Sequence, residues 1–295
     1  MYAAVQPGGT RAIMRWFPPA KRGIARGFRQ AAVPFGTMIA AALLPFMAVR
    51  YGWHAAAWLC AGVSVLGAAL FWGLYREGGD VAAKTERPLP LGKLIHEVGR
   101  NSSFWPVLRL GIAMSAFQFT LTAHIIGFMA DGLGLGLFAA SSMFAATQLA
   151  GIPGRILLPW LSDRFRPGLR TQSFGLVSVI AAGAAAILAA LPIGTAPTIV
   201  LFVLAVLGIF GIGWFPLYLL QIAESAPKGS IASTIAFAST ICLGVMAIGP
   251  YIFGLLVDHF GYGAAWSALI MPVVVTALPL TISSPRLPKA QIGSS

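Results

Sequence analysis

The sequence predicts an all-α integral membrane protein with about eight complete transmembrane helices. Of its 295 residues, 58% are hydrophobic and only 9% are charged, whereas a soluble domain is typically about 25% charged. The mean hydropathy is +0.82. Apolar runs long enough to cross a bilayer as helices, about 17 to 25 residues each, alternate with short polar segments. These three observations exclude a water-soluble globular protein.

The expected spans follow one another along the whole chain. Each is a mainly apolar run of sufficient length, and together they cover residues 28–49, 55–75, 104–129, 137–160, 174–191, 198–222, 231–257 and 264–282. The joint between the second and third spans, "REGGDVAAKTERPLPLGKLIHEVGRN", is the longest and most polar. It fits a linker between two helical bundles.

Basic residues collect on alternate joints, which predicts the orientation of the chain. One set of joints carries Arg11, Arg15, Lys21, Arg22, Arg26, Arg29, Arg76, Lys84, Arg87, Lys93, Arg100, Arg164, Arg166, Arg170, Lys228, Arg286 and Lys289, and the opposite set has only Arg50. Cytoplasmic loops are rich in Lys and Arg. We therefore expect a multi-pass protein of the inner (plasma) membrane with both termini in the cytoplasm.

The net charge of +12 is consistent with this location. In a soluble chain it would indicate a nucleic-acid partner, because basic faces neutralise phosphates. Here the positive residues lie between spans, where they set orientation and contact anionic lipid. The expected partner is the lipid bilayer, and no nucleic acid.

Two stretches of the chain resemble each other. "PAKRG", a span, "YGWHAAAWLCAG" and a second span recur as "APKGS", a span, "FGYGAAWSALIM" and a span. Arg22 matches Lys228 at an offset of 206, and Tyr51 matches Phe260 at an offset of 209. Because the basic joint precedes both copies, the repeats are expected to be parallel, related by an axis along the membrane normal.

The repeat also predicts an incomplete first half. Only 21 residues precede Arg22, whereas 124 separate Phe104 from Lys228. By this symmetry about 100 residues, which is three helices and most of a fourth, are absent from the amino-terminal bundle.

The sequence resembles the major facilitator superfamily. "LSDRF", Leu161 to Phe165, is similar to the family's signature cytoplasmic loop in its second copy, although Pro159 and Arg166 stand where that pattern has glycine. "RGFRQAAVPFGTMIAAALLP" resembles a fifth helix of the family. The resemblance implies a remnant of the amino-terminal bundle in 1–76, a cytoplasmic linker in 77–103, a six-helix bundle in 104–283 and a cytoplasmic tail in 284–295.

Ionisable residues inside spans are candidate site residues, because charge in hydrocarbon is costly. Arg155 lies eight residues before Asp163, about 12 Å along a helix, near the middle of the membrane. Gln148 is seven residues earlier on the same helical face. We expect both to face a solute; the alternative is an arginine that caps backbone carbonyls near Pro153.

Three further polar residues lie on the span 104–129. Arg109 is near its cytoplasmic end, where the side chain can reach water, although the family resemblance keeps a solute contact open. Gln118 and His124 lie deeper. His124 is a candidate proton carrier because its usual pKa lies near neutrality; the alternative is a histidine that packs helices together. In the span 198–222, Trp214 and Tyr218 form a candidate aromatic wall of the site, or packing against a neighbour.

Asp163, Arg164 and Arg166 are the candidate gate. A carboxylate beside arginines at the cytoplasmic mouth can pair differently in two states of a rocking transporter. The alternative is a solvated loop pair.

No metal, nucleophile-elbow or phosphate-loop motif is present, so we expect no enzyme, metal or cofactor. All eight acidic residues fall in joints or at span ends, which biases the expected cavity toward negative solutes. The predicted function is secondary transport of a small organic anion by alternating access. The alternatives are a transport-inactive remnant, or a membrane scaffold that pairs with a second chain supplying the missing helices.

Overall fold

The computed structural model describes residues 22–74, 91–99, 101, 104–227 and 230–282, and in these residues the chain forms helices and no strand. In chain order they are α2 (Arg22–Tyr51), α3 (Trp53–Leu74), α4 (Leu91–Gly99), α5 (Phe104–Gly127), the π-helix η2 (Phe128–Gly132), α6 (Leu137–Phe165), α7 (Arg170–Ala190), α8 (Pro197–Val206), the π-helix η3 (Leu207–Ile212), α9 (Phe215–Glu224) and α10 (Ile231–Ile282).

The predicted spans all coincide with helices. Six candidate spans in the described residues are long and apolar enough to cross a membrane. The last of them holds two predicted spans, since α10 bends at Gly261. The remaining span is α6, whose 29 residues include polar side chains that lower its hydropathy. The all-α membrane fold is therefore confirmed.

The linker differs from its prediction in one respect. Residues 91–99 form the short helix α4, where the sequence predicts only a polar joint. Nine residues are too few to stand out as a span, and Val98 is fully buried, which anchors the helix on the bundle. The rest of the linker except residue 101, the tail 284–295, the residues before Arg22, and Lys228 lie outside the described residues.

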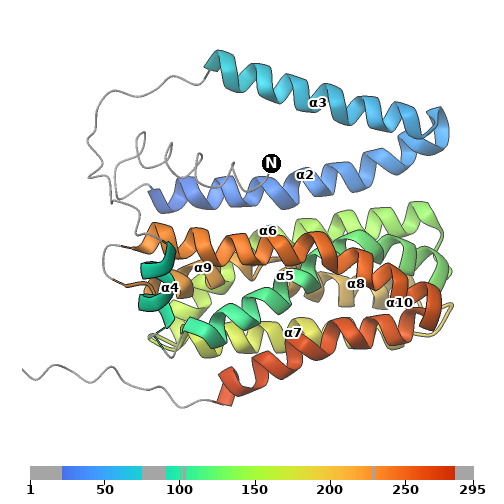
Figure 1. Ribbon diagram of the computed structural model, residues 1–295. Coiled ribbons are helices and arrows are strands. Elements are labelled where there is room, and N and C mark those ends of the chain that lie inside the picture. The colour runs from blue at the N-terminus through green and yellow to red at the C-terminus, as the bar shows by residue number, and fades with distance from the viewer. Residues whose placement is uncertain (1–21, 75–90, 100, 102–103, 228–229, 283–295) are drawn as a thin grey trace, which may run out of the picture.

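Two helices lie beside a larger bundle (Figure 1). α2 packs along α6, and its buried residues Gln30, Pro34 and Ala41 are spaced so that they share one helical face. α3 packs against α2 and buries no residue. In the larger bundle α10 packs against α5 and α7. This arrangement makes the α2–α6 contact the junction between the two parts on either side of the linker.

The two copies of the sequence repeat turn in the same way. Gly52 separates α2 from α3 with φ of 84°, and Gly261 separates the two halves of α10 with φ of 77°. Positive φ is open to glycine because it has no Cβ. The two glycines follow Tyr51 and Phe260, the residues matched by the repeat, so the junction geometry recurs where the sequence does.

α6 is held closely on its other side by η3. A Cβ added to Gly154 would lie 2.5 Å from the carbonyl oxygen of Ile209. The absence of a side chain at Gly154 thus allows two backbones to meet. Because successive residues of an α-helix are rotated by about 100°, Arg155, the next residue, points to a different side of α6.

Candidate functional site

Arg155 joins the two parts of the molecule. It is only 7% exposed, and its Nη1 donates a hydrogen bond to the main-chain carbonyl of Gln30 in α2, at 2.8 Å. The same nitrogen lies 3.4 Å from the Gln30 side-chain oxygen. Both acceptors are neutral oxygens of one residue, so these two contacts fix the guanidinium against α2.

The Gln30 carbonyl is available because of a proline. In an α-helix the N–H of residue i bonds the carbonyl of residue i−4, and proline has no N–H. Pro34 lies inside α2, four residues after Gln30. The carbonyl of Gln30 therefore lacks its usual intrahelical donor, and Arg155 supplies one from α6.

Gln148 is the second predicted residue on α6. It is 3% exposed and precedes Arg155 by about two helical turns, so the two side chains leave α6 on similar faces. Both side chains are therefore buried on the same side of α6. Their contact with a solute stays a prediction.

Gln118, Trp214 and Tyr218 lie together inside the larger bundle. Trp214 Nε1 donates to Gln118 Oε1 at 2.8 Å, which links the residue before α9 to α5. Trp214 stacks on Phe174 of α7, with ring centroids 5.7 Å apart, and the Tyr218 hydroxyl lies 3.4 Å from the Cys242 sulfur. Trp214 and Tyr218 are fully buried, so a solute would reach them only after a rearrangement.

Arg109 and His124 both lie on α5, the first exposed and the second in contact with α10. Arg109 is exposed, in keeping with a side chain that extends to the surface. His124 Nε2 lies 2.8 Å from the carbonyl oxygen of Pro250 in α10, and its ring lies 4.8 Å from that of Phe253. These contacts use His124 to join α5 to α10.

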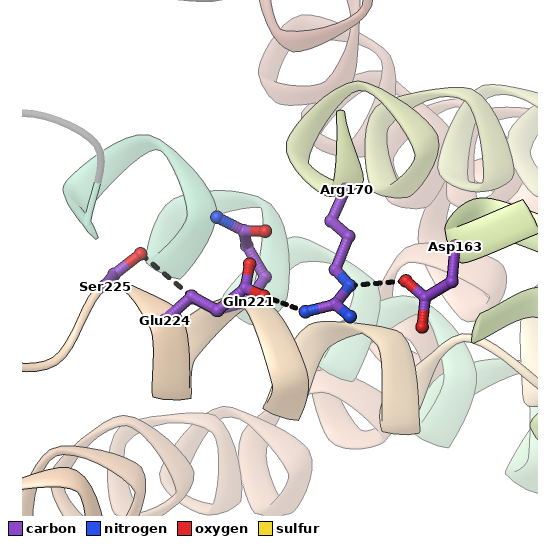
Figure 2. A network of polar contacts seen from close by, with 5 residues as sticks. All are labelled: Asp163, Arg170, Gln221, Glu224 and Ser225. Carbon is purple, nitrogen blue, oxygen red and sulfur yellow. Dashed lines mark hydrogen bonds and ion pairs between the residues drawn. The ribbon is translucent and has the colours of Figure 1, made fainter. Parts of the chain in front are cut away.

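Asp163 pairs with Arg170 and not with its sequence neighbours. Arg170 Nε donates to Asp163 Oδ1 at 2.7 Å, and Arg170 Nη1 pairs with Glu224. Figure 2 shows this guanidinium between the two carboxylates. The pairs tie together the ends of α6, α7 and α9 (Figure 2). Arg164 and Arg166 are exposed and take no part in the ion pairs of the described residues.

Each charge of this network stands at the unfavourable end of its helix. Asp163 is in the last turn of α6 and Glu224 ends α9, although helix carboxyl ends favour cations, while Arg170 begins α7, where anions are favoured. The three charges stabilise one another instead. The ion pairs therefore explain the positions of these three charges, and the dipoles of the individual helices do not.

Sequence reasoning alone does not find the partners Gln30, Arg170 and Glu224. Gln30 is 125 residues from Arg155 and Glu224 is 54 from Arg170, so no local pattern joins them. The one available signal for Gln30 is the proline four residues later. Among the described residues no three His, Cys, Asp or Glu side chains are grouped as metal ligands would be.

Known proteins resemble this chain in sequence and fold. The family model of the Major Facilitator Superfamily (MFS) matches residues 1–250. An uncharacterized MFS-type transporter of Mycobacterium tuberculosis, present in two strains, is 27% identical over 273 residues, which are 92% of this chain and 59% of the relative. An uncharacterized transporter of Bacillus subtilis is 26% identical over 187 residues, which are 55% of this chain and 41% of the relative.

A solved structure has the same fold. It is a bacterial homolog of the human lysosomal transporter Spinster, in an inward-facing and unoccupied conformation, with a TM-score of 0.59 and 17% identity; the match covers 94% of this chain and 71% of that chain. The chain spans about 59% of the length of the mycobacterial relatives it matches. Because the family model covers most of the sequence and the helices adopt the matching fold, the chain belongs to the Major Facilitator Superfamily.

Proposed function

We propose that this chain forms part of a secondary transporter that moves a small organic anion across the plasma membrane by alternating access, with both termini in the cytoplasm. The observation that carries the proposal is Arg155, a cation buried between α2 and α6. Family membership supports a transport role, and the basic joints support the orientation.

The chemistry at Arg155 favours a negative solute. A guanidinium in the membrane is costly, and its contacts with Gln30 are with neutral oxygens. A carboxylate or phosphate offers a charged acceptor that matches the planar guanidinium in two hydrogen bonds. The described carboxylates inside membrane-length helices, including Asp163, Glu224 and Asp258, lie near helix ends or the Gly261 bend.

In alternating access, the contact between α2 and α6 and the ion pairs among α6, α7 and α9 would have different roles. Arg155 and Gln30 lie where α2 meets α6, so a solute bound there touches both parts of the molecule. The Asp163, Arg170 and Glu224 network lies at the end of the larger bundle and acts as a cytoplasmic latch that holds α6, α7 and α9 together.

The test is solute uptake by the purified chain in proteoliposomes. The panel contains labelled monocarboxylates, dicarboxylates and organophosphates with neutral analogues. We expect uptake of one anion class, its loss in Arg155→Gln, and partial uptake in Arg155→Lys, which keeps the charge but not the paired donors. Arg50→Gln, at the exposed end of α2, is the matched control. Unchanged uptake in a normally inserted Arg155→Gln variant overturns the proposal.

A second candidate is a scaffold that is active only with a partner. α3 carries 22 residues and buries none of them, unlike the helices of the larger bundle. Co-expression with the segment of the mycobacterial relative that this chain does not match tests this candidate. Uptake that appears only on co-expression supports it. Uptake by the chain alone contradicts it, and the absence of uptake in both cases supports a transport-inactive remnant.

A further inference from the structure

We propose that Gln30 and Pro34 of α2 are positioning residues of the anion site: Pro34 exposes the Gln30 carbonyl, and Gln30 holds the Arg155 guanidinium in the orientation that receives the solute. The inference rests on the proposed function of Arg155. It extends the site from α6 to α2 and assigns a role to two residues that no motif marks.

The main-chain carbonyl of Gln30 is the acceptor that Pro34 exposes to Arg155. Pro34 removes the donor that would occupy it, and the carbonyl lies on the face of α2 that packs on α6, since Gln30 and Pro34 are both buried. A buried carbonyl without a donor is unfavourable. The Arg155 Nη1, at 2.8 Å, removes that penalty and in return loses its freedom to move.

The side chain of Gln30 also faces Arg155. It is 5% exposed, and its Oε1 faces Arg155 Nη1 at 3.4 Å. The amide NH2 group of Gln30 branches from the same carbon as this oxygen, so it remains within reach of a solute that binds beside Arg155. Its two N–H donors can then bind an oxygen of the solute beside Arg155. The pair therefore favours a solute with a carboxylate or phosphate group over a halide-like ion without several oxygens.

The contact with α2 preorganises the Arg155 side chain for binding. A free arginine side chain loses rotamer freedom when it binds a ligand, which weakens binding. Here the contact with α2 imposes that loss before the solute arrives. Removing the contact should raise the solute KM while leaving the fold intact.

Pro34→Ala tests the carbonyl without touching Arg155. Alanine has a main-chain N–H that restores the intrahelical bond to Gln30, so α2 becomes a better helix and the thermal midpoint rises. We expect the KM for the anion to rise about tenfold, the change typical of one lost hydrogen bond to a charged group.

Pro45→Ala is the matched control, because Pro45 lies in the same helix and frees the carbonyl of Ala41, which Arg155 does not contact. It should raise the midpoint with no change in KM. A Pro34→Ala variant with a higher midpoint and the wild-type KM overturns the inference.

Gln30→Glu and Gln30→Met test the side chain at nearly constant size. The carboxylate introduced by Gln30→Glu would pair with Arg155 and compete with the anion, so we expect the KM to rise by more than about tenfold. Gln30→Met keeps the main-chain carbonyl and removes only the amide, so a rise of about threefold is expected. A residue that merely packs α2 on α6 would tolerate both changes. A wild-type KM in Gln30→Glu contradicts the inference.

The outcomes separate this inference from the proposed function. Normal uptake in Arg155→Gln removes both. Loss of uptake in Arg155→Gln together with wild-type KM values in Pro34→Ala and Gln30→Glu leaves the anion site at Arg155 and removes only the role of α2.

Discussion

Arg170 Nε lies 2.7 Å from Asp163 Oδ1 and ties the start of α7 to the end of α6. The same guanidinium pairs with Glu224 at the end of α9. All three side chains are partly exposed, with 23% for Arg170 and about half for the carboxylates. Exposed pairs are worth about 0.2 to 1 kcal/mol each. The network is therefore too weak to hold the fold and strong enough to bias an equilibrium between two states.

Arg170→Gln should change the transport rate and not solute affinity. Loss of both pairs shifts a two-state equilibrium by about two- to thirtyfold, so we expect the maximal rate to change by a factor in that range with the KM retained. Initial rates of uptake in proteoliposomes measure this effect. Lys93→Gln, on the exposed face of α4, is the control.

High salt and charge reversal give two further tests of the pairing between Asp163 and Arg170. Because salt at 1 M shortens the screening length to about 3 Å and so weakens exposed ion pairs, the rates of wild type and Arg170→Gln should be closer at high salt. The Asp163→Arg, Arg170→Asp double variant should recover part of the lost rate. Equal rates for wild type and Arg170→Gln at low salt would show that the network is a passive surface contact.

Gly154→Ala should destabilise the chain. The new methyl group would meet the Ile209 carbonyl oxygen at 2.5 Å, so α6 and η3 must separate, at a cost of about 1 to 3 kcal/mol. Gly183→Ala in α7 is the matched control, since its Cβ meets nothing within 4 Å and Ala is the better helix former. Thermal unfolding in detergent compares the two. Equal midpoints would mean that α6 and η3 do not meet as closely as described.

Trp214→Phe should lower stability more than it alters transport. The change removes the donor to Gln118 from a fully buried site. In a double-mutant cycle with Gln118→Leu, we expect a coupling of about 0.6 to 1.7 kcal/mol. Uptake by Trp214→Phe tests the other interpretation of these residues. A raised KM at unchanged stability would place Trp214 in the solute site.

Helix positions could be predicted from the sequence because lipid imposes a simple rule. A run such as 104–129 is apolar for the length of a bilayer, and α5 begins at Phe104 as expected. The rule says nothing about α4, which is short, or about the π-helices η2 and η3, because a π-helix leaves no hydropathy signal. Hydropathy also carries no information about which helices are neighbours.

Only part of the candidate site could be predicted from the sequence, because hydropathy does not show which helices are neighbours. Arg155 is conspicuous in an apolar run, but its acceptor is reached through the fold. Sequence proximity alone favours Arg164 and Arg166 as the partners of Asp163. Adjacent residues of a helix point in directions about 100° apart, so Arg170, which lies across the turn, is better placed to pair with Asp163.

Equilibrium binding of a labelled anion to the purified chain is the decisive measurement for an anion site at Arg155, because it does not require transport. We expect that wild type binds the anion found in the uptake panel and that the neutral analogue does not compete. Arg155→Gln should weaken binding by about 10- to 100-fold, the loss typical of charge-assisted hydrogen bonds. An Arg155→Gln protein that is folded and binds the anion with the wild-type Kd would contradict it.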